Sequence, residues 1–273
     1  MITFEQLGHC GRLGNQMFEY AALVSAASRL GVDWGIDFAK EQSANSYKVR
    51  GRFRLRTFEI RVFLELPRVF QLTARPAAAQ LCEYREPHHH FDPDFFSIQD
   101  GTDISGYFQS PKYFESCSDL IRREFTFHPA IRAAADALQP ETPGIQWVSL
   151  HIRRGDYVNN RGVVNLWSTG YYQRAMAQFS GDCQFLCFSD DPAWCRRRLP
   201  RTVRCVDGGS PYVDLCLISR CHHNIIANST FSWWGAWLNA NPRKRVICPK
   251  QWFVPPFCQH DTKDLLCPEW LRV

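Results

Sequence analysis

Residues 145–157 read IQWVSLHIRRGDY, an apolar run that ends in the polar and basic motif HIRRGDY at 151–157. A second apolar run, 224–227, ends in NSTFSWW at 228–234. Each pattern indicates a buried strand whose carboxyl end carries polar side chains, and open α/β sheets bind ligands beyond such strand ends. Two of them in one half of the chain predict a single ligand site.

The first motif combines residues that suit a phosphorylated ligand. It contains His151, Arg153, Arg154 and Asp156, a glycine that relieves the backbone, and Tyr157, which could stack on a ring. Arginine presents a planar fork of N–H groups that matches phosphate oxygens. The alternative is a solvated basic turn that follows a core strand.

The second motif places hydroxyl side chains just before a predicted helix, WWGAWLN. The hydroxyls of Ser229, Thr230 and Ser232 and the unpaired backbone N–H groups of a helix N-terminus could face the same anion. The alternative is an ordinary helix N-cap that binds nothing.

Length and composition favour a globular protein with a small anionic ligand. The chain has 273 residues, of which 45% are apolar and 14% aromatic, so one large or two small domains can bury a full core. The net charge of +5 is modest, and the arginines are scattered without a long basic tract. A nucleic-acid partner is therefore not expected.

The sequence predicts a cytoplasmic protein without a membrane span. No stretch approaches the ~20 apolar residues that a span needs, and the first residues, MITFEQLGHC, lack the features of a secretory signal. Many of the 12 cysteines lie in apolar runs, which predicts free thiols. No CxxC pair occurs, and the paired histidines lack zinc-ligand spacing, so no metal site is predicted.

The second half of the chain alternates strands with helices. The segment PETPG at 140–144 breaks the periodicity and predicts a domain boundary, with one domain at 1–142 and another at 143–273. The predicted strands are 145–152, 184–188, 203–206, 224–227 and 245–248, and the predicted helices are 170–179, 192–199, 211–220 and 231–238. This alternation predicts a parallel sheet with right-handed crossovers.

The first half opens as a strand–loop–helix unit and then becomes less regular. The predicted strands are 2–7, 32–37, 81–84 and 102–107, and the predicted helices are 17–30 and 110–123. Ser110 and Pro111 are the expected cap and first residue of the latter helix. The basic, aromatic segment 40–75 is expected to be irregular or to contact a partner molecule.

Polar residues outside the two motifs have both structural and functional interpretations. Asn15 and Gln16, in GRLGNQ at 11–16, could cap a helix or bind hydroxyls and phosphates. Asp190 and Asp191 end a predicted strand and could cap the next helix or contact a ligand. Asp214 lies in the first turn of a predicted helix, where an acid complements the helix dipole.

Several of these segments together resemble a known family. GRLGNQMFEYA at 11–21, GYFQSPKYF at 106–114, HIRRGDY at 151–157, FSDD at 188–191 and NSTFSWWGAWL at 228–238 are similar, in the same order, to motifs of the α-1,2-fucosyltransferases, glycosyltransferase family 11 of the bacterial type. The resemblance implies a GT-B fold of two facing Rossmann-like domains. Residues 1–142 would form the acceptor-side domain and 143–273 the GDP-fucose-binding domain, whose last segment could pack back on the first.

The resemblance also implies roles for particular residues. His151 would contact the guanosine side of GDP-fucose, Asp214 the guanine and Arg153 the diphosphate. The diphosphate-binding strand end would comprise Ser229, Thr230 and Phe231, and the loop over the fucosyl group would comprise Arg12, Leu13, Gly14 and Asn15. Arg153 and Asn15 would be the catalytic residues, supported by Arg154, Asp156 and Asp190. Arg12 stands where many relatives have a second glycine, which leaves the acceptor open.

The implied reaction is an inverting transfer of L-fucose to the 2-hydroxyl of a terminal β-galactoside, without metal or other cofactor. The sequence does not single out a general base. One alternative is a non-catalytic or lectin-like module that binds a GDP-sugar. Another is a transferase with a different nucleotide sugar, such as GDP-mannose or a UDP-sugar, although Asp214 suits the N–H donors of guanine better than uracil.

Overall fold

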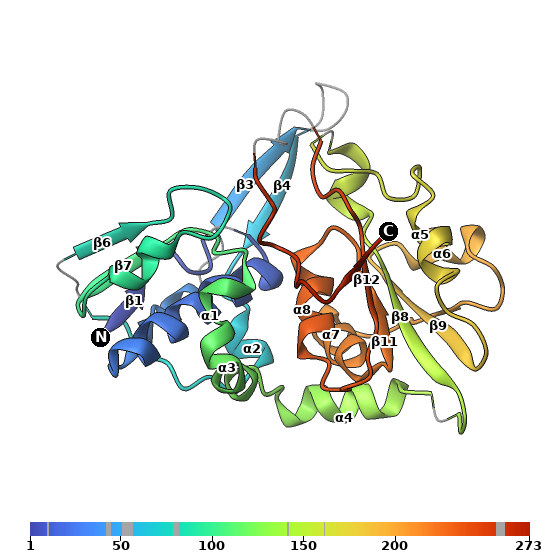
Figure 1. The fold of residues 1–273 in the computed structure, drawn as a ribbon, viewed down its shortest axis with the longest axis horizontal. Coiled ribbons are helices and arrows are strands. Elements are labelled where there is room, and N and C mark those ends of the chain that lie inside the picture. Colours follow the sequence, from blue (N-terminus) through green and yellow to red (C-terminus); the bar gives the residue numbers. More distant parts are fainter. Residues whose placement is uncertain are drawn as a thin grey trace. The chain divides into compact units, whose positions relative to one another are not determined.

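The computed structural model describes residues 1–9, 11–41, 45–50, 57–78, 82–140, 142–160, 162–254 and 260–273. The chain divides into two compact units, Met1–His128 with His260–Cys267, and Pro129–Gln259 with Pro268–Val273. Each unit contains a parallel sheet with helices packed on it (Figure 1). The α/β class with parallel sheets is therefore confirmed.

The sheet of the second unit reverses its strand order in the middle. Its strands are β8 (Gln146–Ile152), β9 (Cys183–Ser189), β10 (Arg204–Cys205), β11 (His223–Ile225), β12 (Val246–Cys248) and β13 (Leu271–Arg272). They lie in the order β10-β9-β8-β11-β12-β13, and all neighbours are parallel. The chain enters at β8, adds β9 and β10 on one side, and then crosses to β11 on the other. Doubly wound sheets bind ligands at such a reversal.

The helices of the second unit largely follow the predicted alternation. They are α4 (Pro129–Leu138), α5 (Tyr171–Met176), α6 (Pro192–Arg198), α7 (Pro211–Arg220) and α8 (Thr230–Leu238), with the 3-10 helix η5 (Gly155–Asn159) after β8. The bounds of α7 are the predicted ones, and those of α6 and α8 differ by one residue. Helix α5 ends before the predicted residue 179, because the chain tightens there into i to i+3 hydrogen bonds such as Phe179 N–H to Met176 O, at 3.0 Å.

Helix α4 was not predicted, and it moves the boundary between the units. It packs against α7, and Arg220 Nη1 lies 2.6 Å from Asp136 Oδ1. The second unit therefore begins at Pro129, one helix before the boundary expected between residues 142 and 143. The segment 140–144 connects two elements of the same unit.

Gly235 allows α7 and α8 to pack closely. A Cβ atom at this position would overlap Cγ2 of Ile218. We expect Gly235→Ala to lower the free energy of unfolding by about 1–3 kcal/mol, because overpacking outweighs the better helix propensity of alanine. Urea unfolding measures the loss, and Ile218→Ala in the same chain should recover part of it. Equal losses with and without Ile218→Ala would contradict the overlap.

The sheet of the first unit also reverses its order. Its strands are β1 (Ile2–Phe4), β2 (Trp34–Ile36), β5 (Arg75–Pro76), β6 (Cys82–Arg85) and β7 (Thr102–Ser105), in the order β5-β2-β1-β7-β6. Helix α1 (Leu13–Leu30) follows β1 and is buried along most of its length. It begins earlier than predicted, because the carboxylate of Glu65 accepts the backbone N–H of Leu13 at 2.9 Å. The order reverses between β1 and β7.

Two structural expectations for the first unit were wrong, the irregular structure at 40–75 and the single helix at 110–123, whereas contact of segment 40–75 with a partner molecule stays a prediction. The segment 40–75 is not irregular where it is described: it contains an antiparallel hairpin, β3 (Asn45–Arg50) with β4 (Thr57–Val62), and the short helices η1 (Phe38–Glu41) and α2 (Leu66–Val69). Residues 42–44 and 51–56 of that segment lie outside the described ones. The single helix expected at 110–123 is broken into η3 (Pro111–Tyr113), η4 (Glu115–Cys117) and α3 (Ser118–Glu124). Another short helix, η2 (Pro93–Ser97), precedes β7.

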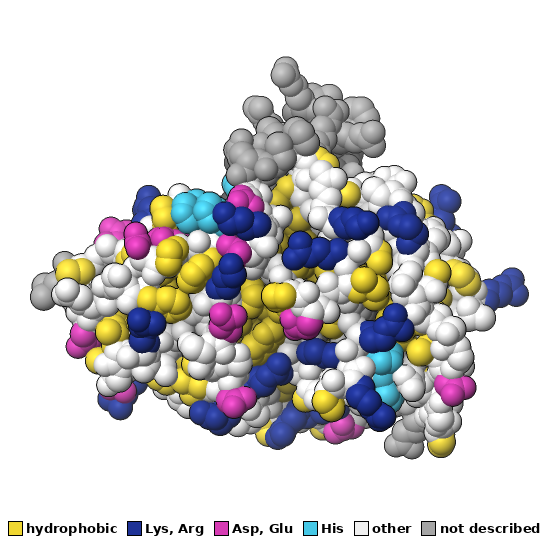
Figure 2. All heavy atoms as spheres, viewed as in Figure 1, with side chains coloured by type: hydrophobic (Ala, Val, Ile, Leu, Met, Phe, Trp, Pro, Cys, Tyr) yellow, Lys and Arg dark blue, Asp and Glu magenta, His cyan; other side chains and the backbone are white. Residues whose placement is uncertain are grey.

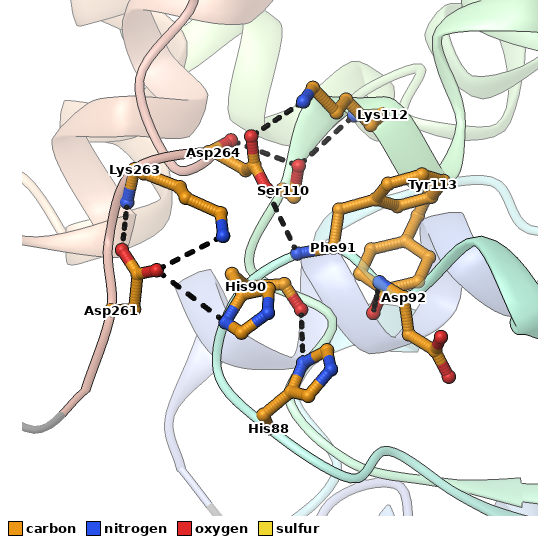
Figure 3. Close-up of polar contacts among 10 residues, drawn as sticks. All are labelled: His88, His90, Phe91, Asp92, Ser110, Lys112, Tyr113, Asp261, Lys263 and Asp264. Carbon is orange, nitrogen blue, oxygen red and sulfur yellow. Dashed lines mark hydrogen bonds and ion pairs between the residues drawn. The ribbon is translucent and has the colours of Figure 1, made fainter.

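The segment His260–Cys267 belongs to the first unit although it is far away in sequence. Asp264 accepts hydrogen bonds from Lys112 Nζ at 2.5 Å and from the backbone N–H of Phe91 at 3.3 Å (Figure 3). The hydroxyl of Ser110 donates to the backbone oxygen of Asp264 at 2.9 Å. His90 Nδ1 lies 3.7 Å from Asp261 Oδ2. After Cys267 the chain returns to the second unit and forms β13.

Surface and composition give few further constraints. On the face drawn in Figure 2, Lys and Arg side chains are scattered among apolar and acidic ones. Across the part of the chain that the structure describes, none of the helices has the length and apolar character that crossing a bilayer requires. The cysteines in the described ranges are free thiols.

Candidate functional site

The two sequence motifs meet at the reversal of the second sheet. Leu150 of β8 pairs with Ile225 of β11, and Ile152 of β8 pairs with Ser189 of β9. The residues that follow these strands, from Arg153, Asn228 and Asp190 onward, are therefore neighbours at one edge of the sheet. Arg153, Arg154, Tyr157, Trp167, Trp194 and Asn228 line a pocket there.

Arg153 is held between two carboxylates. Its Nη2 donates to Asp156 Oδ1 at 2.5 Å, and its Nη1 lies 2.8 Å from Asp190 Oδ2. The guanidinium carbon lies 5.5 Å from the centre of the Tyr157 ring. Only 17% of the Arg153 side chain is exposed. The acids fix the plane of the guanidinium and leave it further N–H groups for a ligand.

The glycine of the first motif is needed for space. A Cβ atom at Gly155 would overlap Oδ2 of Asp190. The φ angle of Gly155 is not in the left-handed region, so the expected relief of the backbone is not its role. Gly155 instead lets the carboxylate of Asp190 approach Arg153.

Arg154 is fixed by Asp190 and by its neighbour Asp191. Its backbone N–H donates to Asp190 Oδ1 at 2.8 Å, and its Nε lies 3.1 Å from Asp191 Oδ2. Its guanidinium stacks on Trp194, 3.7 Å from the ring centre. Asp191 also accepts the backbone N–H of Trp194 at 3.0 Å and so caps α6. Asp191 thus has the capping role, whereas Asp190 positions both arginines.

His151 is a buried, neutral imidazole at the end of β8. It is 5% exposed, and within the described residues its Nδ1 has no hydrogen-bond partner. Burial, with the nearby charge of Arg153, lowers the pKa of His151 to about 3. Its ring centre lies 5.5 Å from that of Phe231. A ligand could therefore meet an unprotonated imidazole at this position.

The N-terminus of α8 supplies backbone donors beside these residues. Ser229 is the N-cap residue, and no side-chain cap hydrogen bond forms there. Phe231 and Thr230 are half-buried in the first turn. Ser232 differs from the expectation, because its hydroxyl accepts the N–H of Ala227 and donates to the oxygen of Ser229, both at 3.2 Å. It braces the turn and is not available to an anion.

Asp214, in the first turn of α7, carries a carboxylate that no described residue pairs. No described residue gives this carboxylate a hydrogen bond or an ion pair. Burial raises the pKa of Asp214 to about 6. A half-buried acid that no described residue pairs is unfavourable for folding, which favours a ligand role over a role in complementing the helix dipole.

The predicted loop residues Arg12, Leu13, Gly14 and Asn15 lie in the first unit. Arg12 is exposed at the start of α1, and Asn15 is half-buried in its first turn. Leu13 and Gly14 are buried, and the N–H of Leu13 is bonded to Glu65. The structure therefore gives Leu13 a place in the core. Gln16 bridges this turn to the segment before α2, because its Nε2 donates to the oxygen of Phe63 at 2.8 Å and its Oε1 accepts the N–H of Glu65 at 2.8 Å.

A family model, glycosyl transferase family 11, matches residues 4–273. The chain belongs to glycosyl transferase family 11. The α-1,2-colitosyltransferase of Escherichia coli is 29% identical to this family 11 enzyme over 96% of each chain. The galactoside 2-α-L-fucosyltransferase Sec1 of Mus musculus is 30% identical, over 96% of this chain and 72% of its own.

Solved structures support the fold of the family 11 enzyme. The fucosyltransferase NodZ from Bradyrhizobium matches with a TM-score of 0.53 and 16% sequence identity, over 86% of this chain and 91% of its own. At this identity the likeness concerns the fold alone. Together with the two parallel sheets, it confirms the GT-B class that the motifs predict.

Two residues that line the candidate site were missed from the sequence. Trp194 supports Arg154, and no sequence signal marks it. Asn228 was quoted in its motif without a role, and its Nδ2 donates to the backbone oxygens of Val164 and Trp252, at 3.1 and 3.0 Å. Tyr157 donates to the backbone oxygen of Asn228 at 3.1 Å. Within the described ranges, no cluster of His, Cys, Asp and Glu could hold a metal ion.

Proposed function

We propose that this enzyme transfers L-fucose from GDP-β-L-fucose to the 2-hydroxyl of a terminal β-galactoside, with inversion to an α-1,2 linkage. The observation that carries the proposal is the family match along nearly the whole chain, with relatives named as α-1,2 transferases or galactoside 2-α-L-fucosyltransferases. The anion-binding features of the second unit agree with a nucleotide diphosphate donor.

Four features of the second unit suit GDP. Backbone N–H groups at the start of α8 favour a diphosphate. The clamped guanidinium of Arg153 adds a fixed positive charge. The carboxylate of Asp214 can accept the N1 and N2 hydrogens of guanine, whereas uracil offers a single N–H donor. The Nδ1 of His151 has no hydrogen-bond partner among the described residues, and we propose that it contacts the guanosine side of the donor.

The chemistry needs stabilisation of the leaving diphosphate. As the oxygen of the acceptor hydroxyl bonds to the anomeric carbon, the bond from that carbon to the phosphate oxygen breaks and GDP takes the electron pair, while the proton of the hydroxyl is released to water. Arg153 and the groups at Ser229 and Thr230 can stabilise this charge without a metal ion. One well-placed donor of this kind contributes ~3 kcal/mol to lowering the barrier. Asn15, from the first unit, is proposed to contact the fucosyl end.

Colitose transfer is a second candidate. It is favoured by the E. coli relative that is named an α-1,2-colitosyltransferase and matches over 96% of each chain. Colitose is L-fucose without the 3-hydroxyl, so the same GDP site would accept both donors. The enzyme is further proposed to act in the bacterial cytoplasm on soluble or lipid-linked glycans, which free thiols support.

The test is a mass-spectrometric assay with GDP-fucose and GDP-colitose against lactose and both N-acetyllactosamine types, with and without EDTA. We expect a deoxyhexose mass increment on a galactoside that persists in EDTA, and loss of the product after α-1,2-specific fucosidase treatment. Activity abolished by EDTA would refute metal independence. A preference for GDP-colitose would assign the second candidate, and no binding of either donor would refute the proposal.

A further inference from the structure

A strained turn follows β7 in the first unit. Phe108 has a φ angle of 49°, the only positive value for a non-glycine residue in the described ranges. This conformation is unfavourable for a bulky side chain and persists where surrounding contacts hold it. The Phe108 ring is fully buried, with ring centres of Phe4, Phe95 and Tyr113 at 5.9, 5.2 and 5.1 Å.

The carboxylate of Glu86 holds this turn. Its Oε2 accepts the backbone N–H groups of Tyr107 at 2.7 Å and of Phe108 at 3.0 Å. Its Oε1 accepts the hydroxyl hydrogen of Tyr113 at 3.2 Å. Because the carboxylate bonds both backbone N–H groups, the direction in which the chain leaves Phe108 is fixed.

The turn directs the next side chain, Gln109, toward Asn15. Gln109 is 8% exposed, and its Nε2 donates to Asn15 Oδ1 at 3.2 Å. On the other side of Asn15, a Cβ atom at Gly11, whose φ angle is +83°, would overlap Nδ2. The Asn15 amide is thus oriented by Gln109 and packs closely against Gly11.

We propose that Gln109 is a positioning residue that sets the direction of the Asn15 amide. Since Gln109 supplies the N–H donor, Asn15 keeps its oxygen toward Gln109 and turns its NH₂ group away from it. Asn15 would then offer a hydrogen-bond donor to the oxygens at the fucosyl-phosphate end of the donor substrate. This inference rests on the proposed function, in which Asn15 meets that end.

Substitutions of equal size separate this role from simple packing. Gln109→Glu presents only acceptors to Asn15, so the Asn15 amide must turn over. Gln109→Met keeps the shape and removes the hydrogen bond. We expect kcat for transfer to fall roughly 10- to 100-fold in Gln109→Glu and less in Gln109→Met, with KM for the acceptor changed by less than about 3-fold. Ser110→Ala is the matched control, because its hydroxyl bonds Asp264 and not Asn15, and it should keep kcat within about 2-fold.

A double-mutant cycle gives the decisive readout. If Gln109 acts through Asn15, Gln109→Met should lower kcat no further once Asn15→Ala is present. The inference would be overturned if the kcat of the double variant fell by the product of the two single-variant losses. It would also be overturned if Gln109→Glu kept the wild-type kcat. Thermal melting of each variant identifies one that fails to fold, in which case the Gln109→Met cycle decides. If the wild-type chain transfers no sugar, the proposed function itself is refuted. If the wild-type chain is active and the Gln109 variants keep its kcat, only the inference about Gln109 is refuted.

Discussion

Arg153→Ala is expected to lower kcat for sugar transfer by roughly 100- to 1,000-fold, the usual effect of losing one fixed donor to a developing negative charge. The large effect is expected because Asp156 and Asp190 hold the guanidinium of Arg153 in one plane. Its remaining N–H groups are therefore oriented before the substrate binds. Arg153→Lys should recover little activity, because an ammonium group cannot bridge both acids and the diphosphate in one plane. Steady-state kinetics with GDP-fucose measure both effects.

Stability must be separated from catalysis in this experiment. Without Arg153, the carboxylates of Asp156 and Asp190 face each other without a counter-charge, so the variant should also be less stable. Adding Asp190→Asn should restore much of the melting temperature and none of the activity. Arg196→Ala is the control, since Arg196 pairs with Asp207 on the exposed surface and should keep kcat within about 2-fold. If Arg153→Ala combined with Asp190→Asn regained both its melting temperature and its transfer activity, Arg153 would act only by stabilising the fold.

Asp214→Asn is expected to weaken GDP binding by roughly 10- to 100-fold, the typical value of a paired hydrogen bond to a base edge, while the free protein becomes no less stable. The carboxylate has no partner in the described residues, so removing its charge relieves a desolvation cost. Isothermal titration with GDP and thermal melting give the two quantities. If the GDP affinity of Asp214→Asn is unchanged, Asp214 only complements the dipole of helix α7.

The pH dependence provides a second test of Asp214. Its pKa is raised from 3.8 to about 6 in the folded protein, so the folded state holds this proton more tightly than the unfolded chain. The stability that Asp214 contributes is therefore greatest below pH 4 and is lost as the pH rises through 6. Relative to Asp214→Asn, the free energy of unfolding should fall over that range. GDP affinity should instead rise with pH through 6 in the wild type and not in the variant.

The second unit could be predicted from its sequence because its strands are short apolar runs separated by helices with clear ends. Helix α7 is the clearest example, since Ser210 and Pro211 mark its start. The hairpin β3–β4 was missed although its sequence alternates, with Tyr47 and Val49 in one strand and Phe58 and Ile60 in the other. Basic residues between them made the segment look like irregular surface.

The residues of the candidate site could be proposed from the sequence, but the contacts between them could not. The positions of Arg153, Asp156 and Asp190 were identified, but the ion pair between Arg153 and Asp190 depends on the register of β8 against β9. Likewise, Ser232 resembles an anion ligand in sequence, and only its hydrogen bonds to Ala227 and Ser229 show that it braces a turn.

The return of His260–Cys267 to the first unit, followed by β13 in the second, bears on how the protein is made. During synthesis, Lys112 and Ser110 emerge from the ribosome long before Asp264, and β12 emerges before its neighbour β13. Neither unit can complete its contacts until residues 260–273 have left the exit tunnel. Both units should therefore reach full protease resistance together and late, although nearly all of the first unit is translated before the second begins.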